Sequence, residues 1–426
     1  MRDVLSILIV GSEILDGRIQ DTNSQFLAQG LDTLGYKLAH TLSCTDTIST
    51  IHQSLDFLFE HSSVVIVSGG LGPTSDDLTT EAIANYCKRQ LVTDEQALDE
   101  LRDLFSRRKR TFDPANRKQV VFPEGSTIVK NPVGTAPGFT ISFSRDSELC
   151  HVISLPGVPS ELALMFEASV PALLERMLPS PKPLAKALLR VFGVPESTVG
   201  RCVREAVGQA DVVVSYRAKF PEVQVLFKGD SRELVLRQAN VARSAIGPEF
   251  VFSDDANVSF IQVVHELLLK EQLTISIAES CTGGLIGKLL TETPRSSRYF
   301  LGGITTYANE AKTAILTVER ELIETNGAVS HVVALKLAKN VREKFRSDLA
   351  LSCTGIAGPE GGTAEKPVGT FFIGVAEGDR ISSFQFFYPA SRDRVRLYAA
   401  YVAIDLLRRR LAKLPLPPTV QSEATL

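Results

Sequence analysis

Short apolar runs alternate with longer segments of helical periodicity along most of the chain. Runs such as LSILIV (residues 5–10) and VVIVS (residues 64–68) are each followed by a polar, glycine-containing stretch and then by a helical pattern. Strands that alternate with helices in this way are typical of parallel sheets covered by helices. The pattern therefore predicts an α/β fold.

Two breaks in composition divide this pattern into three predicted domains. The stretch LPSPKPLAK (residues 178–186) carries three prolines within five positions, and the turn-rich stretch GPEFVFSDDANVS (residues 247–259) forms the second break. We expect domains at residues 1–177, 184–250 and 256–413, which are ordinary domain sizes. The proline-rich, polar residues 414–426 are predicted to be disordered.

Composition narrows the possible functions. The chain has 426 residues, 44% of them hydrophobic and 22% charged, and its net charge of -3 gives no broad basic surface for nucleic acid. Its six cysteines show no CxxC spacing, which favours reduced thiols over a zinc site. No run approaches the roughly 20 apolar residues of a membrane-spanning helix. We therefore expect a cytoplasmic protein without membrane partners.

The stretch AESCTGG (residues 278–284) lies between the strand-like run TISI and a helical pattern. A strand that ends at a helix N-terminus presents free backbone N–H groups, which can bind a phosphate or a developing oxyanion. Gly283 and Gly284 would let a ligand approach the backbone closely. Alternatively, Ser280 only caps the helix. The stretch alone leaves both interpretations open.

Two further stretches favour a catalytic site in the last predicted domain. The glycine-rich stretch SCTGIAGPEGGTAEKPVGT (residues 352–370) also follows a strand-like run, and long polar loops of this kind tend to bind ligands. The stretch TYANEAK (residues 306–312) places Lys312 close to Tyr307 and Asn309. A serine nucleophile needs a base, and a lysine with a lowered pKa can serve. Because neither histidine of this domain lies in a glycine-rich loop, a Ser-Lys hydrolase is favoured, although an isolated lysine is more often solvated.

The motifs AESCTGGLIGKL, TYANEAK, NGAVS, TGIAGPEGG, KPVGT and RDRVR resemble, in order and spacing, the nicotinamide-nucleotide amidase domain of the CinA family. The resemblance implies hydrolysis of the carboxamide of nicotinamide mononucleotide to nicotinate mononucleotide and ammonia, with no metal or other cofactor. It implies Ser280 as the nucleophile, Lys312 as the base, and Tyr307 and Thr354 beside them. The implied substrate-binding positions are Thr282, Gly283, Gly284, Asn309, Gly355 and Gly358, with Arg392 and Arg396 for the nucleotide phosphate.

This sequence departs from the family pattern at two positions of the same domain. Arg295 stands where a glycine is usual, and His331 stands where an acidic residue is expected. Neither departure involves the implied nucleophile or base. Backbone N–H groups at the start of the helix after Ser280 are expected to hold the oxyanion, and such donors are commonly worth about 10²–10³ in rate.

A second candidate site lies in the stretch SGGLGPTSDDLT (residues 68–79). Gly70 and Gly72 follow a predicted strand, and Thr74, Asp76 and Asp77 stand at the apparent start of a helix. The two carboxylates either cap this helix or hold a divalent ion, because Mg²⁺ is typically bound by one or two carboxylates plus phosphate oxygens. The residues alone slightly favour capping.

The motifs GSEIL, DTNSQFLA, SGGLGPTSDDLT, NPVGTAPGF and LPGVPSEL resemble the molybdopterin-binding-like domain that begins CinA proteins. For some members the resemblance implies metal-dependent hydrolysis of ADP-ribose to AMP and ribose 5-phosphate. Ser12 stands where members with a GDEL motif have Asp, a departure that bears on metal or substrate binding. The matching acidic positions are Asp46 and the four candidate ligands of Mg²⁺ or a similar metal, Glu13, Asp76, Asp77 and Glu161; substrate positions are Gly70, Gly72, Thr74, Asn131 and Gly134.

The middle segment, residues 184–250, resembles the small KH-like α+β module of the same family. It lacks the GxxG loop that clamps a nucleic-acid backbone, so we interpret it as a spacer or dimer contact. The basic run SRRKR (residues 106–110) is interpreted as a solvated loop, and a nucleic-acid partner is not expected. The predicted architecture is two three-layer α/β domains joined by a KH-like α+β module, and the family usually forms homodimers.

Three hypotheses about function follow. The leading one is an amidase of pyridine-nucleotide salvage, and the second adds an ADP-ribose pyrophosphatase in the first domain. The non-enzymatic alternative is a nucleotide-binding protein linked to competence or recombination, in which both sites bind ligands without turnover.

Overall fold

The computed structural model describes residues 4–207 and 211–426. The chain folds into two compact units, Met1–Leu184 and Ala185–Leu426. It is a mixed α/β protein, and the described residues form four sheets, two of them six-stranded. All six cysteines are free. In the part of the chain that the structure describes, no helix is long and apolar enough to cross a membrane.

The first unit is built on a mixed six-stranded sheet. Its strands are β1 (Leu5–Val10), β2 (Leu38–Cys44), β3 (Val64–Ser68), β6 (Thr127–Val129), β7 (Gly138–Arg145) and β8 (Glu148–Leu155). They lie in the order β2-β1-β3-β8-β7-β6. The first four strands pair in parallel, whereas β7 pairs antiparallel with both β8 and β6. β1 and β3 are buried along their whole length, which explains their continuously apolar sequences.

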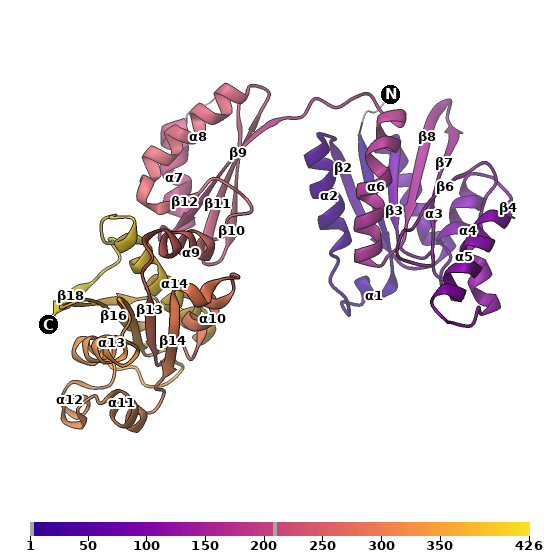
Figure 1. Ribbon diagram of the computed structural model, residues 1–426. Helices are drawn as coiled ribbons and strands as arrows, with labels where there is room; N and C mark the ends of the chain where they lie inside the picture. The colour runs from indigo at the N-terminus through magenta and orange to yellow at the C-terminus, as the bar shows by residue number, and fades with distance from the viewer. Residues whose placement is uncertain (1–3, 208–210) are drawn as a thin grey trace. The chain divides into compact units, whose positions relative to one another are not determined.

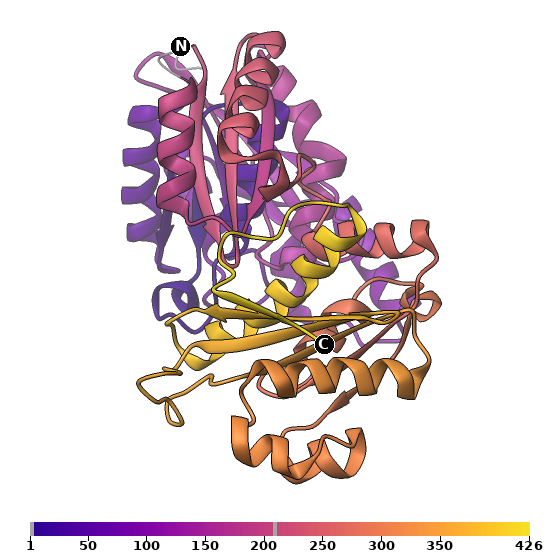
Figure 2. The same ribbon diagram turned by 90° about the vertical axis from the view of Figure 1, so that its left-hand side faces the viewer.

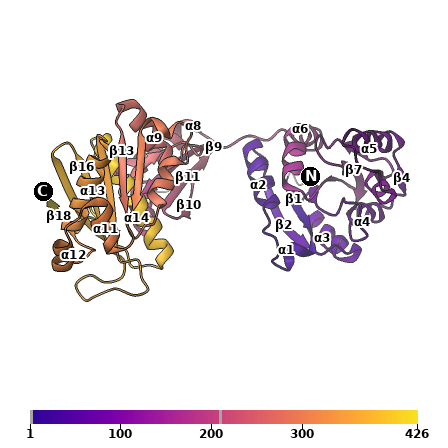
Figure 3. The ribbon, with the colours of Figure 1, turned by 60° about the horizontal axis from the view of Figure 1, so that its bottom comes forward.

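Helices cover both faces of this sheet (Figures 1 and 3). Side chains alternate along β1, so that Ile7 and Ile9 pack toward α2 and α6, whereas Leu8 and Val10 pack toward α3 and α4. A small two-stranded antiparallel sheet, an α-helical turn and a 3-10 helix complete the unit. The helices are α1 (Ser12–Leu15), α2 (Asn23–Leu34), α3 (Ile48–His61), α4 (Thr79–Tyr86), α5 (Glu95–Arg107), η1 (Pro114–Val120) and α6 (Pro159–Met177); the small sheet pairs β4 (Leu91–Thr93) with β5 (Val121–Pro123).

The second unit begins with a four-stranded antiparallel sheet in the order β10-β11-β9-β12. Its elements are β9 (Ala185–Phe192), α7 (Glu196–Val207), β10 (Val213–Lys219), β11 (Glu222–Gly229), α8 (Arg232–Ile246), η2 (Pro248–Phe250) and β12 (Val251–Ser253). Phe192 of β9 belongs to the core of the following larger sheet and packs on Phe260, with ring centroids 4.8 Å apart. The predicted middle and last domains therefore share one compact unit.

The larger sheet of the second unit has the order β14-β13-β15-β16-β17-β18. Its strands are β13 (Ile275–Glu279), β14 (Phe300–Thr305), β15 (Leu349–Gly355), β16 (Thr370–Glu377), β17 (Arg380–Phe387) and β18 (Ser422–Thr425). β14, β13 and β15 run parallel to one another. From β15 onward, through β16, β17 and β18, each strand pairs antiparallel with its neighbour. The carboxyl ends of the three parallel strands therefore lie at one edge of the sheet.

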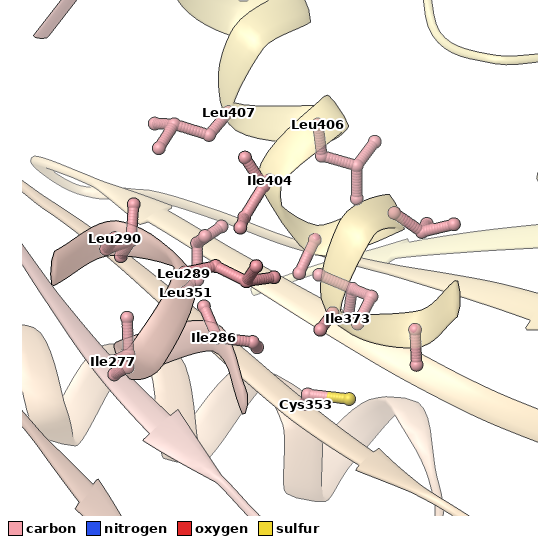
Figure 4. Packing of buried hydrophobic residues seen from close by; sticks show 14 of the residues in the cluster. Ile277, Ile286, Leu289, Leu290, Leu351, Cys353, Ile373, Ile404, Leu406 and Leu407 are labelled. Atoms are coloured by element: carbon pink, nitrogen blue, oxygen red, sulfur yellow. The ribbon is translucent and has the colours of Figure 1, made fainter. Parts of the chain in front are cut away.

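Helices also cover both faces of this second sheet. Figure 2 shows α14 on one face and α13 on the other. In Figure 4, apolar side chains of α10 and α14 pack against Ile277, Leu351 and Ile373 of the sheet. The helices are α9 (Phe260–Glu271), α10 (Leu285–Thr291), η3 (Ser296–Arg298), α11 (Asn309–Leu316), α12 (Arg320–Asn326), α13 (His331–Phe345) and α14 (Arg392–Leu411).

The prediction that residues 414–426 are disordered is wrong for the end of the chain. Ser422–Thr425 forms β18, which pairs antiparallel with β17 in the register Ser382↔Thr425 to Gln385↔Ser422. Without β18, the backbone groups of β17 would form an open sheet edge, and strand addition satisfies them. Ser422 is also anchored by its side chain, 2.8 Å from His331 Nε2. A composition rule for disorder does not include such long-range pairing.

Candidate active site

Strand geometry places Ser280 and Glu279 on opposite faces of the larger sheet. Successive side chains of a strand point to opposite faces, and Ile275 and Ile277 of β13 pack toward α10 and α14. Glu279 continues this series on the α10 side, whereas Ser280 points the other way, toward α11. The same edge of the sheet carries Thr306, directly after β14, because β13 and β14 are parallel neighbours. The three segments therefore meet where the strands end.

Ser280 and Lys312 form a buried pair. Lys312 Nζ lies 3.2 Å from Ser280 Oγ, and the two residues are 1% and 9% exposed. The same nitrogen donates to the backbone carbonyls of Thr306 (2.9 Å) and Tyr307 (3.3 Å). A neutral amine has two N–H groups and one lone pair. If a neutral Lys312 keeps both N–H groups on the carbonyls, its lone pair is left to accept from the Ser280 hydroxyl.

Burial favours the neutral form of this amine. Desolvation lowers the pKa of Lys312 below its ordinary value, and Cys281 and Glu310 oppose this change only in part. No carboxylate of the described residues forms an ion pair with Lys312, whose partners are a hydroxyl and two carbonyls. Lys312 is thus a buried lysine next to a serine, not the solvated helix residue considered as the alternative.

The start of α10 is not the open anion site that the sequence suggested. The carboxylate of Glu279 accepts hydrogen bonds from the backbone N–H groups of Gly284 (3.0 Å), Ile286 (3.1 Å) and Gly287 (2.9 Å). The physical reason is that a buried carboxylate needs donors, and the first turn of a helix supplies them. Ser280 does not cap α10 either. The N-cap residue of α10 is Gly284, and the helix has no side-chain cap.

Gly283 and Gly284 have positive φ angles of 59° and 97°, a conformation that favours glycine. Among the described residues, the backbone N–H groups of Cys281 and Thr282 have no hydrogen-bond partner, whereas Gly283 N–H donates to the carbonyl of Ser280. These two N–H groups, and not the first turn of α10, are the free backbone donors beside Ser280. An N–H group directly after a nucleophilic serine is a common oxyanion donor.

Arg392 and Arg396 of the RDRVR motif are hydrogen-bonded to the protein. Arg396 donates from Nε to the carbonyl of Cys281 (3.1 Å) and from Nη2 to that of Thr282 (3.0 Å), so it supports the turn that carries Ser280. Arg392 donates to the carbonyl of Gly358 (2.6 Å) and to Tyr307 Oη (2.5 Å). Arg392 therefore ties the glycine-rich loop to the segment before α11.

The remaining predicted residues of this site have mainly structural contacts. Thr354 Oγ1 donates to the carbonyl of Ala328 (2.8 Å), which joins β15 to the NGAVS segment. A Cβ at Gly355 would lie 2.6 Å from Phe371 Cβ, so this position needs glycine for packing. Asn309 begins α11 and lines a cavity of about 290 Å³ together with Arg320 of α12. Tyr307 is 57% exposed.

The two departures from the family pattern lie away from the pair of Ser280 and Lys312. Arg295 has a φ of 74°, in the left-handed region where glycine is favoured, which explains why glycine is usual there. His331 is the first residue of α13, and its ring contacts the hydroxyls of Ser383 (3.2 Å) and Ser422 (2.8 Å). In this chain His331 therefore anchors the C-terminal strand β18.

The second candidate site lies where the parallel strands of the first unit end. A cavity of about 560 Å³ is lined by the segments that follow β1, β2, β3 and β8. Six carboxylates and no basic side chain line it, and Gly70 and Gly72 form part of its wall. The structure thus brings together sequence motifs that are far apart in the chain. The six carboxylates belong to Glu13, Asp21, Asp46, Asp76, Asp77 and Glu161.

Several of these carboxylates have donors within the protein, including Asp21, which accepts from Ser24 N–H (2.9 Å). Asp46 accepts from the N–H (2.7 Å) and hydroxyl (2.9 Å) of Ser12, so the departure at Ser12 supplies a donor where the family motif has a carboxylate. Asp77 accepts from the N–H (2.8 Å) and hydroxyl (2.5 Å) of Thr74 within the turn before α4, and it does not cap that helix, whose N-cap residue is Leu78 without a side-chain cap. Glu161 Oε2 accepts from Asn131 Nδ2 at 2.7 Å.

The four predicted metal ligands do not form a ready-made cage. In the chain as described, no three His, Cys, Asp or Glu side chains converge closely enough to hold one ion. Glu13, Asp76, Asp77 and Glu161 only share the wall of the cavity. A Mg²⁺ ion held by one or two of these carboxylates and completed by ligand phosphates fits this arrangement, whereas a site of protein ligands alone does not.

The loop that contains Asn131 and Gly134 packs against the carboxylate of Glu161. Gly134 N–H donates to Asn131 Oδ1 (2.7 Å), and a Cβ at Gly134 would lie 2.1 Å from Glu161 Oε2. Thr74, Asn131 and Gly134 support the carboxylates from behind and do not line the cavity themselves. Sequence reasoning missed Asn23, which lines the cavity, is 7% exposed and has an Oδ1 atom without a partner in the described residues. Its position inside the DTNS motif was the available signal.

Together the fold and the sites define a mixed α/β protein with a buried serine–lysine pair in one unit and a carboxylate-lined cavity in the other. Two protein families match the chain, "Probable molybdopterin binding domain" over residues 6–175 and "CinA C-terminal domain" over residues 257–411. The chain belongs to the CinA family. This agrees with the resemblance found in its motifs.

Two full-length relatives support this assignment. A CinA-like protein of Geobacter sulfurreducens is 38% identical over 414 residues, which cover 96% of this chain and 99% of that protein. A CinA-like protein of Dictyoglomus thermophilum is 38% identical over 416 residues, covering 96% and 99%. A crystal structure of a CinA protein from Thermoplasma acidophilum is 34% identical and covers 39% of this chain and 95% of its own, with a TM-score of 0.35.

Proposed function

We propose that the second unit is a nicotinamide-nucleotide amidase, which hydrolyses the carboxamide of nicotinamide mononucleotide to nicotinate mononucleotide and ammonia. Membership of the CinA family, which includes such amidases, points to the reaction class. The observation that carries the proposal is the 3.2 Å contact between Lys312 Nζ and Ser280 Oγ in a buried site. A nucleophile within hydrogen-bond reach of a base is what covalent amide hydrolysis requires.

The reaction would proceed in two stages. Ser280 Oγ attacks the carboxamide carbon while Lys312 takes the hydroxyl proton, and the oxyanion forms against the N–H groups of Cys281 and Thr282. The C–N bond then breaks, Lys312 returns the proton to the leaving nitrogen, and ammonia departs from an acyl-enzyme. A water molecule, deprotonated by Lys312, releases nicotinate mononucleotide and restores Ser280. Every proton is carried by Lys312, so these steps need no metal.

Nucleotide binding is assigned to the surroundings of this pair. The glycine-rich loop at Gly358 and the turn at Gly283 lie next to Arg392 and Arg396, respectively. Because both arginines already donate to backbone carbonyls, a substrate phosphate would share these donors or replace a carbonyl partner. The main contribution of Arg396 would then be support of the catalytic turn, and the contribution of Arg392 would be the ordering of the loop over the substrate.

The test is release of ammonia and nicotinate mononucleotide from nicotinamide mononucleotide, with a chelator present. The intact protein should turn over, and Ser280→Ala should lose at least about 10²-fold in kcat, because the covalent route is closed. Ser49→Ala, at an exposed position of the first unit, is a matched control that should leave turnover unchanged. Full activity of Ser280→Ala would refute the serine mechanism.

The cavity of the first unit supports a second activity, hydrolysis of ADP-ribose to AMP and ribose 5-phosphate with a divalent metal. The specific observation in its favour is that Glu13, Asp76, Asp77 and Glu161 line the same cavity as the glycine-rich loop. The metal would polarise the pyrophosphate and join the carboxylates to an anionic ligand. Metal-dependent release of AMP that disappears in Asp77→Ala is the test; AMP release unaffected by the substitution would contradict this role for Asp77.

The wider setting of the protein is also part of this proposal. We place it in the cytoplasm as a homodimer, with the KH-like middle segment as spacer or dimer contact. Each sheet with helices on both faces would form a three-layer domain. If both units stabilise with nucleotides but release no product, the non-catalytic alternative linked to competence or recombination is favoured instead.

A further inference from the structure

We propose that Glu279 is a positioning residue that fixes the turn carrying Ser280, and so sets the geometry between Ser280 and Lys312. This inference rests on the proposed amidase function and adds to it a residue that neither the motif comparison nor the mechanism assigns. The arrangement that carries it is a buried carboxylate, one residue before the nucleophile, bonded to the far end of the same turn.

The carboxylate closes the turn at both ends. Glu279 ends β13, and its two oxygens accept the N–H groups of Gly284, Ile286 and Gly287 at 2.9–3.1 Å. The five residues that follow Glu279, 280–284, include the nucleophile and two glycines with positive φ. Glycine gives a turn more freedom than any other residue, so the turn has little stiffness of its own. Its conformation therefore depends on what holds its ends.

Because Glu279 is buried, its carboxylate depends on these hydrogen bonds. Glu279 is 2% exposed, and its side-chain partners in the described residues are these three backbone N–H groups, with no lysine or arginine in an ion pair. A buried carboxylate is tolerated only if strong donors surround it, and the positive end of α10 adds to their effect. The charge is thus held only while the start of α10 keeps its place against β13.

Other hydrogen bonds of residues 280–284 also hold this turn in place. Ser280 N–H donates to the carbonyl of Cys353 (2.9 Å), and Arg396 donates to the carbonyls of Cys281 and Thr282. With the first turn of α10 occupied by Glu279, the N–H groups of Cys281 and Thr282, which have no partner among the described residues, are the backbone donors left for the oxyanion. Glu279 acts on the reaction through Ser280 and does not touch the substrate.

The decisive substitution is Glu279→Gln, which keeps the size of the side chain but replaces one acceptor oxygen by an NH₂ group that faces backbone donors. Misplacement of reacting groups by about 1 Å can cost about 10²-fold in rate, so kcat should fall by this order while KM changes little. Ser259→Ala is the matched control, because Ser259 Oγ caps α9 by accepting from Gln262 N–H (3.1 Å) in the same unit. It should lower the melting temperature without lowering kcat.

A second readout is independent of the natural substrate. Labelling by a fluorophosphonate, followed by intact mass, reports how well Ser280 is placed against Lys312, and Ser280→Ala defines the background. We expect slow labelling of Glu279→Gln and normal labelling of Ser259→Ala, both measured below their melting temperatures. Intact protein that labels but does not hydrolyse nicotinamide mononucleotide would refute the proposed function while leaving the role of Glu279 testable by the labelling rates.

Three results would overturn the inference. The first is Glu279→Gln with wild-type kcat and labelling rate, and the second is an intact protein in which Ser280 does not label at all. The third concerns folding: if Glu279→Gln does not fold, Glu279→Asp is measured instead, since it keeps the charge on a shorter side chain. If neither variant folds, Glu279 is required for the fold rather than for placing the nucleophile.

Discussion

Replacing Lys312 by methionine should change the pH dependence of stability in a calculable way. Burial lowers the pKa of Lys312 in the folded protein below its ordinary value of 10.5. Between these two pKa values the unfolded chain binds one more proton than the folded chain, so the free energy of unfolding rises with pH. Below the folded pKa both states are protonated, and the full penalty of burying the charge remains. Lys312→Met removes this proton from both states.

The expected signal is the difference in unfolding free energy between the wild type and Lys312→Met. It should increase by about 1.4 kcal/mol for each pH unit inside the window between the lowered folded pKa and 10.5, and stay flat outside it. Urea unfolding followed by far-ultraviolet circular dichroism suits a chain without tryptophan. Lys344→Met, at an exposed position of α13, is the control and should shift the free energy equally at every pH.

Lys312 should also determine how the rate of hydrolysis depends on pH. If neutral Lys312 is the base, kcat/KM for nicotinamide mononucleotide should rise with pH along a limb centred below 10.5, and Lys312→Met should lose about 10²–10⁴-fold. Parallel stability curves for the wild type and Lys312→Met at all pH values would refute the lowered pKa. An activity limb that persists in Lys312→Met would refute its role as the base.

Three other substitutions test separate parts of the structure. Arg392→Ala removes a donor that holds the carbonyl of Gly358 (2.6 Å), so it should raise KM for nicotinamide mononucleotide more than it lowers kcat, as steady-state kinetics would show. Gly134→Ala would place a methyl group 2.1 Å from Glu161 Oε2 and should destabilise the first unit by about 1–3 kcal/mol in urea unfolding. Asp405→Asn removes the counter-charge of two buried arginines and should cost about 3–5 kcal/mol by the same measurement.

The pattern of strands and helices pointed to the regions of both candidate sites. Parallel strands end at one edge of a sheet, so a motif after each strand predicts a shared site without any knowledge of side-chain contacts. This reasoning applies to the segments after β13, β14 and β15 and to those after β1, β3 and β8. The mixed α/β class followed from the same pattern. The hydrogen-bond partners of individual side chains could not be predicted from this pattern.

Long-range contacts explain what the sequence could not predict. Arg396 and Cys281 are 115 positions apart, and Arg392 and Arg396 of the RDRVR motif bind backbone carbonyls that no pattern identifies. The strand β18 formed from a composition that predicts disorder, because pairing with β17 depends on the rest of the fold. Glu279 was within reach of sequence reasoning, since strand alternation alone directs it to the side of α10. What could not be foreseen was that its carboxylate would occupy the expected anion site.

The two sites differ in charge, and this difference has a chemical consequence. The cavity of the first unit is lined by six carboxylates and no basic side chain, so a phosphate-bearing ligand entering it alone meets repulsion from every wall. A divalent cation would reverse that balance. The serine site carries Lys312 and two arginines beside the nucleophile, and its one adjacent buried carboxylate is held by backbone N–H groups. A chelator should therefore weaken nucleotide binding to the first unit and leave the second unit unaffected.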